Sequence, residues 1–182
     1  MDELESYVAR EIPHMRRFAR SLCGSADEGD DLVQDALERA WRKRDSWRRE
    51  GSVRGWLFRI LYRVFLNSRR KAKPVLADTD PEIMADPVHE RLPPQEARLA
   101  ADDVLRGLAS LPDDQRAAVL LVALEGVSYD EAAVVLDVPI GTLRSRLFRG
   151  REALRQMVSD AERMPARETA DRRTTTRLRR VK

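Results

Sequence analysis

The stretch VSYDEAAVVLDVPIGTLRSRLFRGREAL, residues 127–154, contains two helix signals separated by a turn of a few residues. Ser128 stands three positions before Glu131, the spacing at which a hydroxyl caps a helix while the carboxylate reaches back to the cap. That helix is expected to end near Leu136. Pro139 suits the first turn of a following helix, where no amide proton is needed. Two helices joined so closely predict a helix-turn-helix.

The second helix of this pair is basic, whereas the charged residues of the first are all acidic. Leu143 and Leu147, four residues apart, predict its buried side. Other positions therefore face away from the core, as contacts in a DNA groove require. The side chains expected on that outer surface are Arg144, Ser145, Phe148 and Arg149.

Asp137 occupies the turn, where a helix-turn-helix usually has a glycine with positive φ. Aspartate tolerates that conformation better than most residues, so the motif is still expected. In the alternative interpretation, the arginines only keep the outer face of an amphipathic helix solvated, as most charge runs do. We favour DNA binding, because the capping signal immediately precedes the basic helix.

The rest of the chain has apolar residues every three to four positions and no alternating strand pattern, so the predicted fold class is all-α. Helices are expected over residues 4–22, 26–43, 53–71, 95–108, 113–124, 128–136 and 139–157.

Residues 73–95 contain five of the nine prolines and no glycine. This composition favours an extended, semi-rigid linker. We therefore expect two small helical domains joined by a Pro-rich linker, the second ending in the helix-turn-helix. The predicted boundaries are 1–72 and 96–160 for the domains, 73–95 for the linker, and 161–182 for a basic tail that is expected to be disordered.

The net charge of +3 divides into +4, −3, −3 and +5 over these four segments in chain order. Positive charge in the first domain and the tail is compatible with nucleic-acid binding. The longest apolar run has eight residues, against about 20 for a membrane helix. Because the acidic N-terminal segment also lacks the features of a secretory signal, we expect a cytoplasmic protein without membrane contact.

Cys23 is the single cysteine, and His14 and His89 are the only histidines. This set excludes an intramolecular disulfide and a thiolate zinc cluster, and no phosphate-binding loop is present. We expect no catalytic residue, no metal, no cofactor and no enzymatic activity. Cys23 is expected to be a small buried hydrophobe, and both histidines to be incidental.

Residues 127–154 resemble the promoter-recognising fourth region of extracytoplasmic-function (ECF) RNA polymerase sigma factors of the sigma-70 family. DDLVQDALERAW (30–41) resembles the helix of that family that docks on polymerase, and WLFRILYRVFLNSRRK (56–71) resembles its promoter-melting segment. With LPDDQRAAVLL (111–121), the motifs follow the family order over residues 5–158. Residues 15–40 are further similar to the general-stress-response branch of alphaproteobacteria.

The resemblance implies an alternative sigma factor that binds core RNA polymerase, recognises two promoter elements and promotes DNA melting. On residues 30–41 the spacing gives a surface with an acidic edge and an apolar centre, which suits a partner helix. In the family this face contacts the coiled coil of the largest subunit, and the flap is a further contact. The alternative is an ordinary solvated helix with its leucine in the core. The residues implied for polymerase binding are Asp31, Leu32, Gln34, Asp35 and Glu38.

The helix over 53–71 places cations and an amide among aromatic rings, a mixture that suits single-stranded DNA. Trp56, Phe58 and Phe65 recur with the apolar stripe and are expected to be structural. An asparagine amide can both donate to and accept from a base. The family often has Asn at position 63, where this chain has Arg, so the preferred base should differ. The residues expected at the melted element are Arg59, Arg63, Asn67, Arg70 and Lys71.

For the upstream promoter element, the family motif transfers onto the outer surface of the second helix of the helix-turn-helix. A threonine near its start can bind phosphate. The full set of expected contacts is Thr142, Arg144, Ser145, Arg146, Phe148 and Arg149. The resemblance also implies an anti-sigma factor, a small soluble one, which we expect to contact both domains. The rival interpretations are a helix-turn-helix regulator that acts without being a polymerase subunit, and a helical adaptor that binds only protein.

Overall fold

The computed structural model describes residues 3–44, 47, 52–72 and 104–175. Over these residues the chain is helical and contains no strand, which confirms the all-α prediction. Residues 104–110 form a short helix. The other elements are α1 (Glu3–Cys23), α2 (Ala26–Arg42), α3 (Val53–Ala72), α5 (Asp113–Val119), the π-helical turn η2 (Leu120–Leu124), α6 (Tyr129–Leu136) and α7 (Ile140–Thr175).

A sharp turn joins α1 to α2. Gly24 adopts a φ of +75° and donates its N–H to the carbonyl of Arg20 at 2.9 Å, which ends α1. Ser25 then caps α2 with its hydroxyl. At Gly29 an added Cβ would lie 2.7 Å from the Cα of Arg20, so this glycine lets the two helices touch through their backbones.

The core of the first half lies between α1, α2 and α3 and is rich in aromatic rings. Phe18 of α1 and Phe58 of α3 are fully buried and meet edge to face, with ring centroids 5.2 Å apart. Each buried ring of this kind contributes about 2–3 kcal/mol through burial. Phe65 is also buried and Trp56 is half-buried, as expected for structural rings.

In the second half, α5 does not continue as a regular helix to Leu124 as predicted. Its last turn is η2, in which Glu125 donates its N–H to the carbonyl of Leu120 at 3.0 Å, five residues back. A π turn holds one residue more than an α turn and so rotates every following position by about 100° around the axis. Glu125 is the first residue after this turn.

The helix-turn-helix is confirmed. The hydroxyl of Ser128 accepts the N–H of Glu131 at 3.2 Å, and Asp137 takes the left-handed conformation with φ 57°. The second half of the capping box does not form, because the Glu131 carboxylate accepts a hydrogen bond from the Ser52 hydroxyl instead. Pro139 was expected in the first turn of this helix but lies just before it, because α7 begins one residue later, at Ile140.

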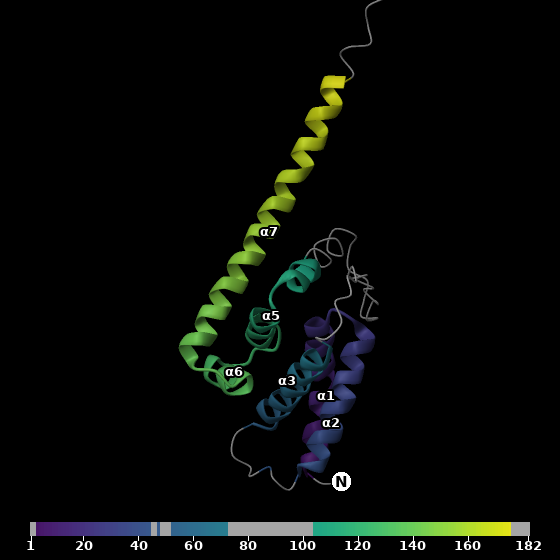
Figure 1. The fold of residues 1–182 in the computed structure, drawn as a ribbon, viewed down its shortest axis with the longest axis vertical. Helices are drawn as coiled ribbons and strands as arrows, with labels where there is room; N and C mark the ends of the chain where they lie inside the picture. The colour runs from purple at the N-terminus through teal and green to yellow at the C-terminus, as the bar shows by residue number, and fades with distance from the viewer. Residues whose placement is uncertain (1–2, 45–46, 48–51, 73–103, 176–182) are drawn as a thin grey trace, which may run out of the picture.

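The two halves pack against each other, so the buried apolar residues of both form one cluster. In Figure 1, α5 and α6 lie beside the bundle of α1, α2 and α3. We expected two domains separated by a linker, and a shared core was not foreseen, because apolar periodicity does not show which element covers a face. The predicted linker, residues 73–95, lies outside the described residues.

Helix α7 extends well beyond the helix-turn-helix and points away from the body (Figure 1). We expected a disordered tail from residue 161, but α7 continues to Thr175. A helix satisfies its backbone hydrogen bonds locally, and the Ala, Arg and Glu residues of this stretch have high helix propensity. No helix in the described part of the chain is both long and apolar enough to cross a membrane.

Candidate nucleic-acid interface

A pocket lined largely by basic side chains lies between α2 and α3, with a volume of about 360 Å³. Side chains at four-residue spacing on α3 share one face and so meet in this pocket. We call it the basic pocket. Its lining residues are Arg39, Lys43, Trp56, Arg59, Ile60, Arg63 and Asn67.

The basic pocket brings together three of the residues predicted for the melted element, namely Arg59, Arg63 and Asn67. The sequence analysis missed Arg39 of α2 and Lys43, the residue that follows α2 as its C-cap. Their four-residue spacing could have indicated a shared face. Cations, an amide and an indole ring are groups that hold the phosphates and bases of a single strand.

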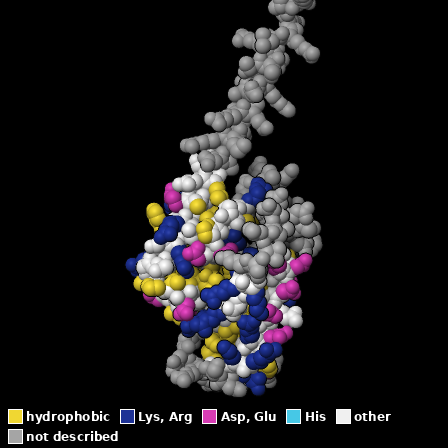
Figure 2. Space-filling model, viewed as in Figure 1, with side chains coloured by type: hydrophobic (Ala, Val, Ile, Leu, Met, Phe, Trp, Pro, Cys, Tyr) yellow, Lys and Arg dark blue, Asp and Glu magenta, His cyan; other side chains and the backbone are white. Residues whose placement is uncertain are grey.

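Two further predicted residues, Arg70 and Lys71, lie exposed at the carboxyl end of α3, outside the pocket lining. Cations at this end also oppose the helix dipole, which is a structural reason for their presence. Figure 2 shows Lys and Arg side chains gathered on the lower part of the molecule, over the bundle of α1, α2 and α3. The first half therefore presents a positive surface around the pocket.

The outer face of α7 exposes most of the residues predicted for the upstream element, whereas Leu143 and Leu147 are buried on the opposite face. Phe148 is 68% exposed, an unusual position for a large apolar ring. Arg146 differs, because it is partly buried and forms an ion pair with Asp114 of α5 at 3.0 Å. The exposed residues are Thr142, Arg144, Ser145, Phe148 and Arg149.

The face of α2 predicted to bind polymerase is acidic at its surface. Asp31, Gln34, Asp35 and Glu38 are exposed. Leu32 is only 6% exposed and packs in the core, so it does not form the apolar centre expected for this face. Because α2 packs on two neighbouring helices, the apolar side chain that lies between the acidic positions in the sequence points into the core.

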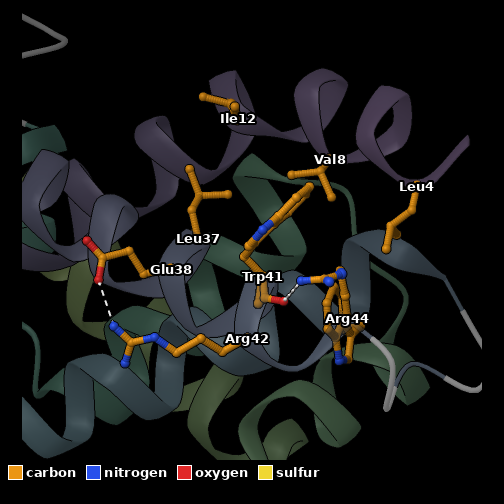
Figure 3. A pocket seen from close by; sticks show the side chains of 10 residues that line it. Leu4, Val8, Ile12, Leu37, Glu38, Trp41, Arg42 and Arg44 are labelled. Atoms are coloured by element: carbon orange, nitrogen blue, oxygen red, sulfur yellow. Dashed lines mark hydrogen bonds and ion pairs between the residues drawn. The ribbon is translucent and has the colours of Figure 1, made fainter. Parts of the chain in front are cut away.

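An apolar groove between α1 and α2 lies next to this acidic face, with a volume of about 480 Å³ (Figure 3). Leu37 of α2 lines it, and Trp41, 49% exposed, points toward Val8 of α1. Glu38 also lines the groove, and its carboxylate adds a negative charge to this face. The apolar part of the α2 surface is therefore supplied by Leu37 and Trp41, which the sequence analysis did not select.

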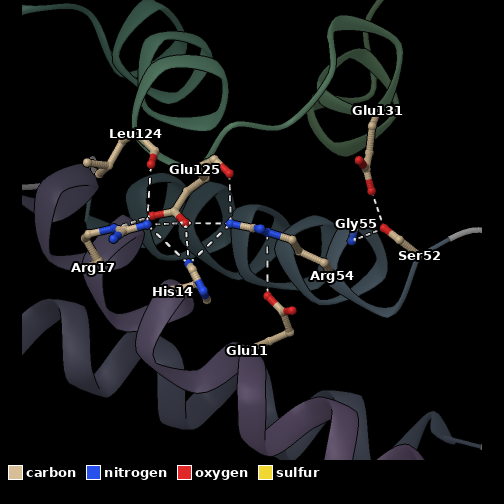
Figure 4. A network of polar contacts seen from close by, with 9 residues as sticks. All are labelled: Glu11, His14, Arg17, Ser52, Arg54, Gly55, Leu124, Glu125 and Glu131. Atoms are coloured by element: carbon tan, nitrogen blue, oxygen red, sulfur yellow. Dashed lines mark hydrogen bonds and ion pairs between the residues drawn. The ribbon is translucent and has the colours of Figure 1, made fainter.

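A polar network joins the two halves at Glu125, whose side chain is completely buried (Figure 4). Arg17 of α1 donates two hydrogen bonds to the carboxylate, both of 2.9 Å, and these raise the pKa of Arg17. Arg54 of α3 donates to the carboxylate at 2.8 Å and to the Glu125 carbonyl at 2.9 Å. His14 lies 3.0 Å away and is thus part of this network rather than incidental.

The sequence analysis missed Glu125. A single acid directly after the eight-residue apolar run, and directly before Gly126, could have indicated it. Gly126 adopts a φ of +65°, which completes the turn that directs the carboxylate toward α1 and α3.

A second contact between the halves involves the helix-turn-helix itself. Oδ1 of Asp137 lies 3.6 Å from Nη2 of Arg59, and Oδ2 lies 3.5 Å from Nη2 of Arg63. Both arginines line the basic pocket. The turn between α6 and α7 therefore contacts two arginines of the surface predicted to bind DNA.

Comparison with known proteins identifies both halves. Residues 8–62 match the family model for the sigma2 domain of PhyR, and residues 101–154 match that for sigma-70 region 4. The chain is 37% identical over 153 residues to the ECF RNA polymerase sigma factor EcfG of Rhodopseudomonas palustris (strain TIE-1), covering 84% of this chain and 83% of the relative. The chain belongs to the ECF sigma factors.

A second relative is also an ECF sigma factor. Sigma-E of Escherichia coli (strain K12) is 36% identical over 156 residues, covering 79% of this chain and 81% of the relative. The match to EcfG, together with the PhyR family model, confirms the resemblance to the alphaproteobacterial stress branch. Sigma-factor function is therefore supported, and the interpretations as a separate regulator or a protein-only adaptor are not favoured.

Two solved structures resemble this sigma factor over most of its length. RpoE of Bartonella quintana, crystallised with the anti-sigma factor NepR, has a TM-score of 0.72 and 31% identity over 87% of this chain and 98% of that chain. CnrH, solved with the cytosolic domain of CnrY, has a TM-score of 0.64 and 27% identity over 86% of this chain and 88% of that chain. Each match extends over both halves of the ECF sigma factor described here.

Proposed function

We propose that this ECF sigma factor opens promoter DNA with its first half and recognises the upstream promoter element with its second. Residues 1–72 would act in melting and polymerase binding, and residues 96–160 in upstream recognition. The protein would act in the cytoplasm as a dissociable polymerase subunit and catalyse no reaction itself.

The observation that supports this proposal best is the basic pocket. Arg59 and Arg63 are placed to hold phosphates, and the amide of Asn67 lines the same cavity. An unstacked base costs a few kcal/mol to expose. Contacts that exist only with the single strand offset that cost, so the pocket favours the melted state.

The upstream element would be bound by the exposed face of α7. Arg144 and Arg149 can pair with guanine edges in the major groove or hold phosphates. The hydroxyl of Thr142, in the first turn of α7, suits a phosphate contact. Arg146 would act differently, since its ion pair with Asp114 fixes α7 against α5.

Polymerase would bind the acidic face of α2 together with the neighbouring apolar groove. A coiled coil on the largest polymerase subunit fits such a face, because it offers a helix with apolar and charged sides. Asp35 and Glu38 would supply the charges, and Trp41 the apolar anchor.

Neither half needs to bind DNA tightly alone. Once polymerase holds both halves, the second DNA contact becomes intramolecular, so modest contacts combine into strong binding. The free protein should therefore bind promoter DNA weakly.

An anti-sigma factor is a further proposed partner. One of the similar structures holds RpoE with the anti-sigma factor NepR, and the other holds CnrH with the cytosolic domain of CnrY. An inhibitor gains most when it covers the polymerase-binding and DNA-binding surfaces together, so we propose that it contacts both halves.

Runoff transcription with core polymerase tests the proposed function. We expect Asn67→Ala to reduce open-complex formation, Arg149→Ala to reduce transcription in a way that depends on promoter sequence, and Asp35→Ala to weaken polymerase association at every promoter. Arg155→Ala is the matched control on α7, because Arg155 is exposed and pairs only with its helix neighbour Glu152 among the contacts described.

Failure of the unaltered chain to start transcription with core polymerase at any promoter would refute the proposal. Sequence-specific DNA binding without polymerase would support a separate regulator instead. Equal losses in Arg149→Ala and Arg155→Ala would refute the assigned role of the α7 face.

A further inference from the structure

The inner side of α7, opposite its exposed face, packs on α5 (Figure 1). At a surface radius of about 5–6 Å, a rotation of a helix by about 20° about its own axis moves a side chain by about 2 Å. A hydrogen bond tolerates a spread of only about 0.5 Å in its length. The contacts between α7 and α5 therefore determine whether the exposed face can meet base edges.

An ion pair fixes one point of this contact. Nε of Arg146 lies 3.0 Å from Oδ2 of Asp114 in α5. The other oxygen, Oδ1, accepts the backbone N–H of Gln115 at 2.9 Å, so the carboxylate is itself held in one orientation. The Arg146 side chain is only 22% exposed, whereas the neighbouring Arg144 is exposed. The Arg146 cation is thus directed at α5 rather than outward.

A close approach of the two helices fixes a second point. Gly150 lies four residues after Arg146, on the same side of α7. A Cβ added at Gly150 would lie 2.8 Å from Cγ2 of Val119 and 3.5 Å from the carbonyl oxygen of Gln115. Val119 is only 6% exposed, so it has little room to move aside. The two contacts lie about one turn apart and together fix the rotation of α7 as well as its position along α5.

We propose that Arg146, Asp114 and Gly150 are positioning residues for recognition of the upstream promoter element. They set the angle at which α7 presents Arg144 and Arg149 to the DNA and do not bind it themselves. The inference rests on the proposed role of the exposed α7 face. It also changes the role of Arg146, which the sequence analysis placed among the DNA contacts.

The proposal and simple electrostatics predict opposite effects for the loss of Asp114. Removing an acid makes the chain more positive, which strengthens its general attraction to phosphates. If Asp114 orients α7, its loss should instead weaken sequence-specific binding, although it belongs to a different helix from the DNA-facing residues. Asp114 is therefore the position at which the proposal is tested most sharply.

The first experiment uses holoenzyme assembled from core polymerase and the full chain. The unaltered holoenzyme first selects a promoter fragment from a library of random sequence. Fluorescence anisotropy then gives the affinity for this fragment and for the same fragment with its upstream element scrambled. We call the quotient of the two affinities the specificity ratio.

We expect Asp114→Asn to lower the specificity ratio by about tenfold, as the loss of one base contact would. Affinity for the scrambled fragment should stay within about twofold. The matched control is Asp113→Asn, which removes the same charge from the same turn of α5. Because Asp113 pairs with Arg69 and Arg116 and not with α7 among the contacts described, this control should keep the ratio. An unchanged ratio in Asp114→Asn, or an equal loss in the control, would overturn the proposal.

Arg146→Gln should reproduce the loss seen in Asp114→Asn. The double variant should lose no more than either single variant, because the two residues form one contact. Additive losses would contradict the proposal. So would a loss in Arg146→Gln that is equal for both fragments and lowers the salt slope by about one, since that result is typical of a direct phosphate contact.

A second experiment tests the close approach without changing any charge. Gly150→Ala should also lower the specificity ratio, since its methyl group meets Val119. Val119→Ala in the same chain removes the methyl group that stands in the way and should restore most of the ratio. A folded Gly150→Ala variant with a full ratio would overturn the role of Gly150. If circular dichroism shows that Gly150→Ala is unfolded, the charge variants at Asp114 and Arg146 decide the proposal.

These outcomes separate the inference from the proposed function. If the unaltered holoenzyme binds both fragments equally well, recognition of the upstream element by this chain is refuted. If it distinguishes the fragments and Asp114→Asn does so equally well, only the positioning role is refuted.

Discussion

Arg116 is a buried cation whose hydrogen bonds go to backbone carbonyls, beside a longer ion pair of 3.8 Å with Asp113. Its guanidinium donates to the carbonyl of Leu22 in α1 at 2.7 Å and to that of Leu108 at 2.7 Å. It also donates to Ala109 at 2.6 Å and Leu111 at 2.9 Å. Burial lowers the pKa of this guanidinium, which the Asp113 carboxylate partly opposes. One side chain thus binds carbonyls at the end of α1, at the end of the short helix 104–110 and in the turn before α5.

We predict that Arg116→Met lowers the free energy of unfolding by about 3 kcal/mol, because these carbonyls lose their donor in a buried place. Urea denaturation followed by circular dichroism measures the change. Arg144→Met, at an exposed position, should stay within about 0.5 kcal/mol of the unaltered chain. Equal effects of the two substitutions would contradict the role of Arg116.

Cys23 is the second residue with a distinctive environment. Burial raises the pKa of its thiol to about 11, from an ordinary value of 9.0. The sequence analysis expected a small buried hydrophobe, and the residue is half-buried with its thiol protonated at neutral pH.

We predict that Cys23 reacts with Ellman's reagent at pH 8 about 100-fold more slowly in the folded chain than in urea, as its thiolate fraction implies. Because the folded pKa is the higher one, its contribution to stability is complete below pH 9 and is lost as pH rises toward 11. Cys23→Ser should remove this part of the pH dependence. Rapid reaction of the folded chain would contradict the prediction.

At the scale of elements, the contact between α1 and α2 depends on Gly29. We predict that Gly29→Ala destabilises the protein by about 2 kcal/mol, because the new methyl group would meet backbone atoms that cannot move aside. In Gly141→Ala, an added Cβ has nothing within 4 Å, so alanine should stabilise α7 by up to about 1 kcal/mol. The midpoints of thermal unfolding of the two variants are compared. If both substitutions destabilise the protein, the close approach of α1 at Gly29 is not the reason for the loss of stability.

At the scale of the whole molecule, the halves are joined by the buried pair of Arg54 and Glu125. We predict that a double-mutant cycle of Arg54→Gln and Glu125→Gln, measured by urea unfolding, gives a coupling of about 2 kcal/mol. The exposed pair of Arg42 and Glu38, with side chains 76% and 52% accessible, should give about 0.5 kcal/mol or less. Similar couplings for the two pairs would mean that burial adds nothing to the contact between the halves.

Much of the helical fold is predictable from the sequence, because its signals are local. The turn at Gly24, the cap at Ser128 and the left-handed Asp137 depend on residues a few positions away. The exposed α7 face follows from the spacing of Leu143 and Leu147 in the same way. Three of the residues predicted for the melted element also lie together in the basic pocket, because positions 59, 63 and 67 must share a helix face.

The tertiary structure alone decides which charges meet. Glu125 pairs with Arg17 across 108 residues, and Leu32 is buried only because α2 packs on two neighbours. Periodicity assigns each helix a buried face but not the element that covers it, so neither contact is visible in the chain. The sequence therefore determined the helices, the helix-turn-helix and the family, while the packing of the halves determined where their acids and arginines lie.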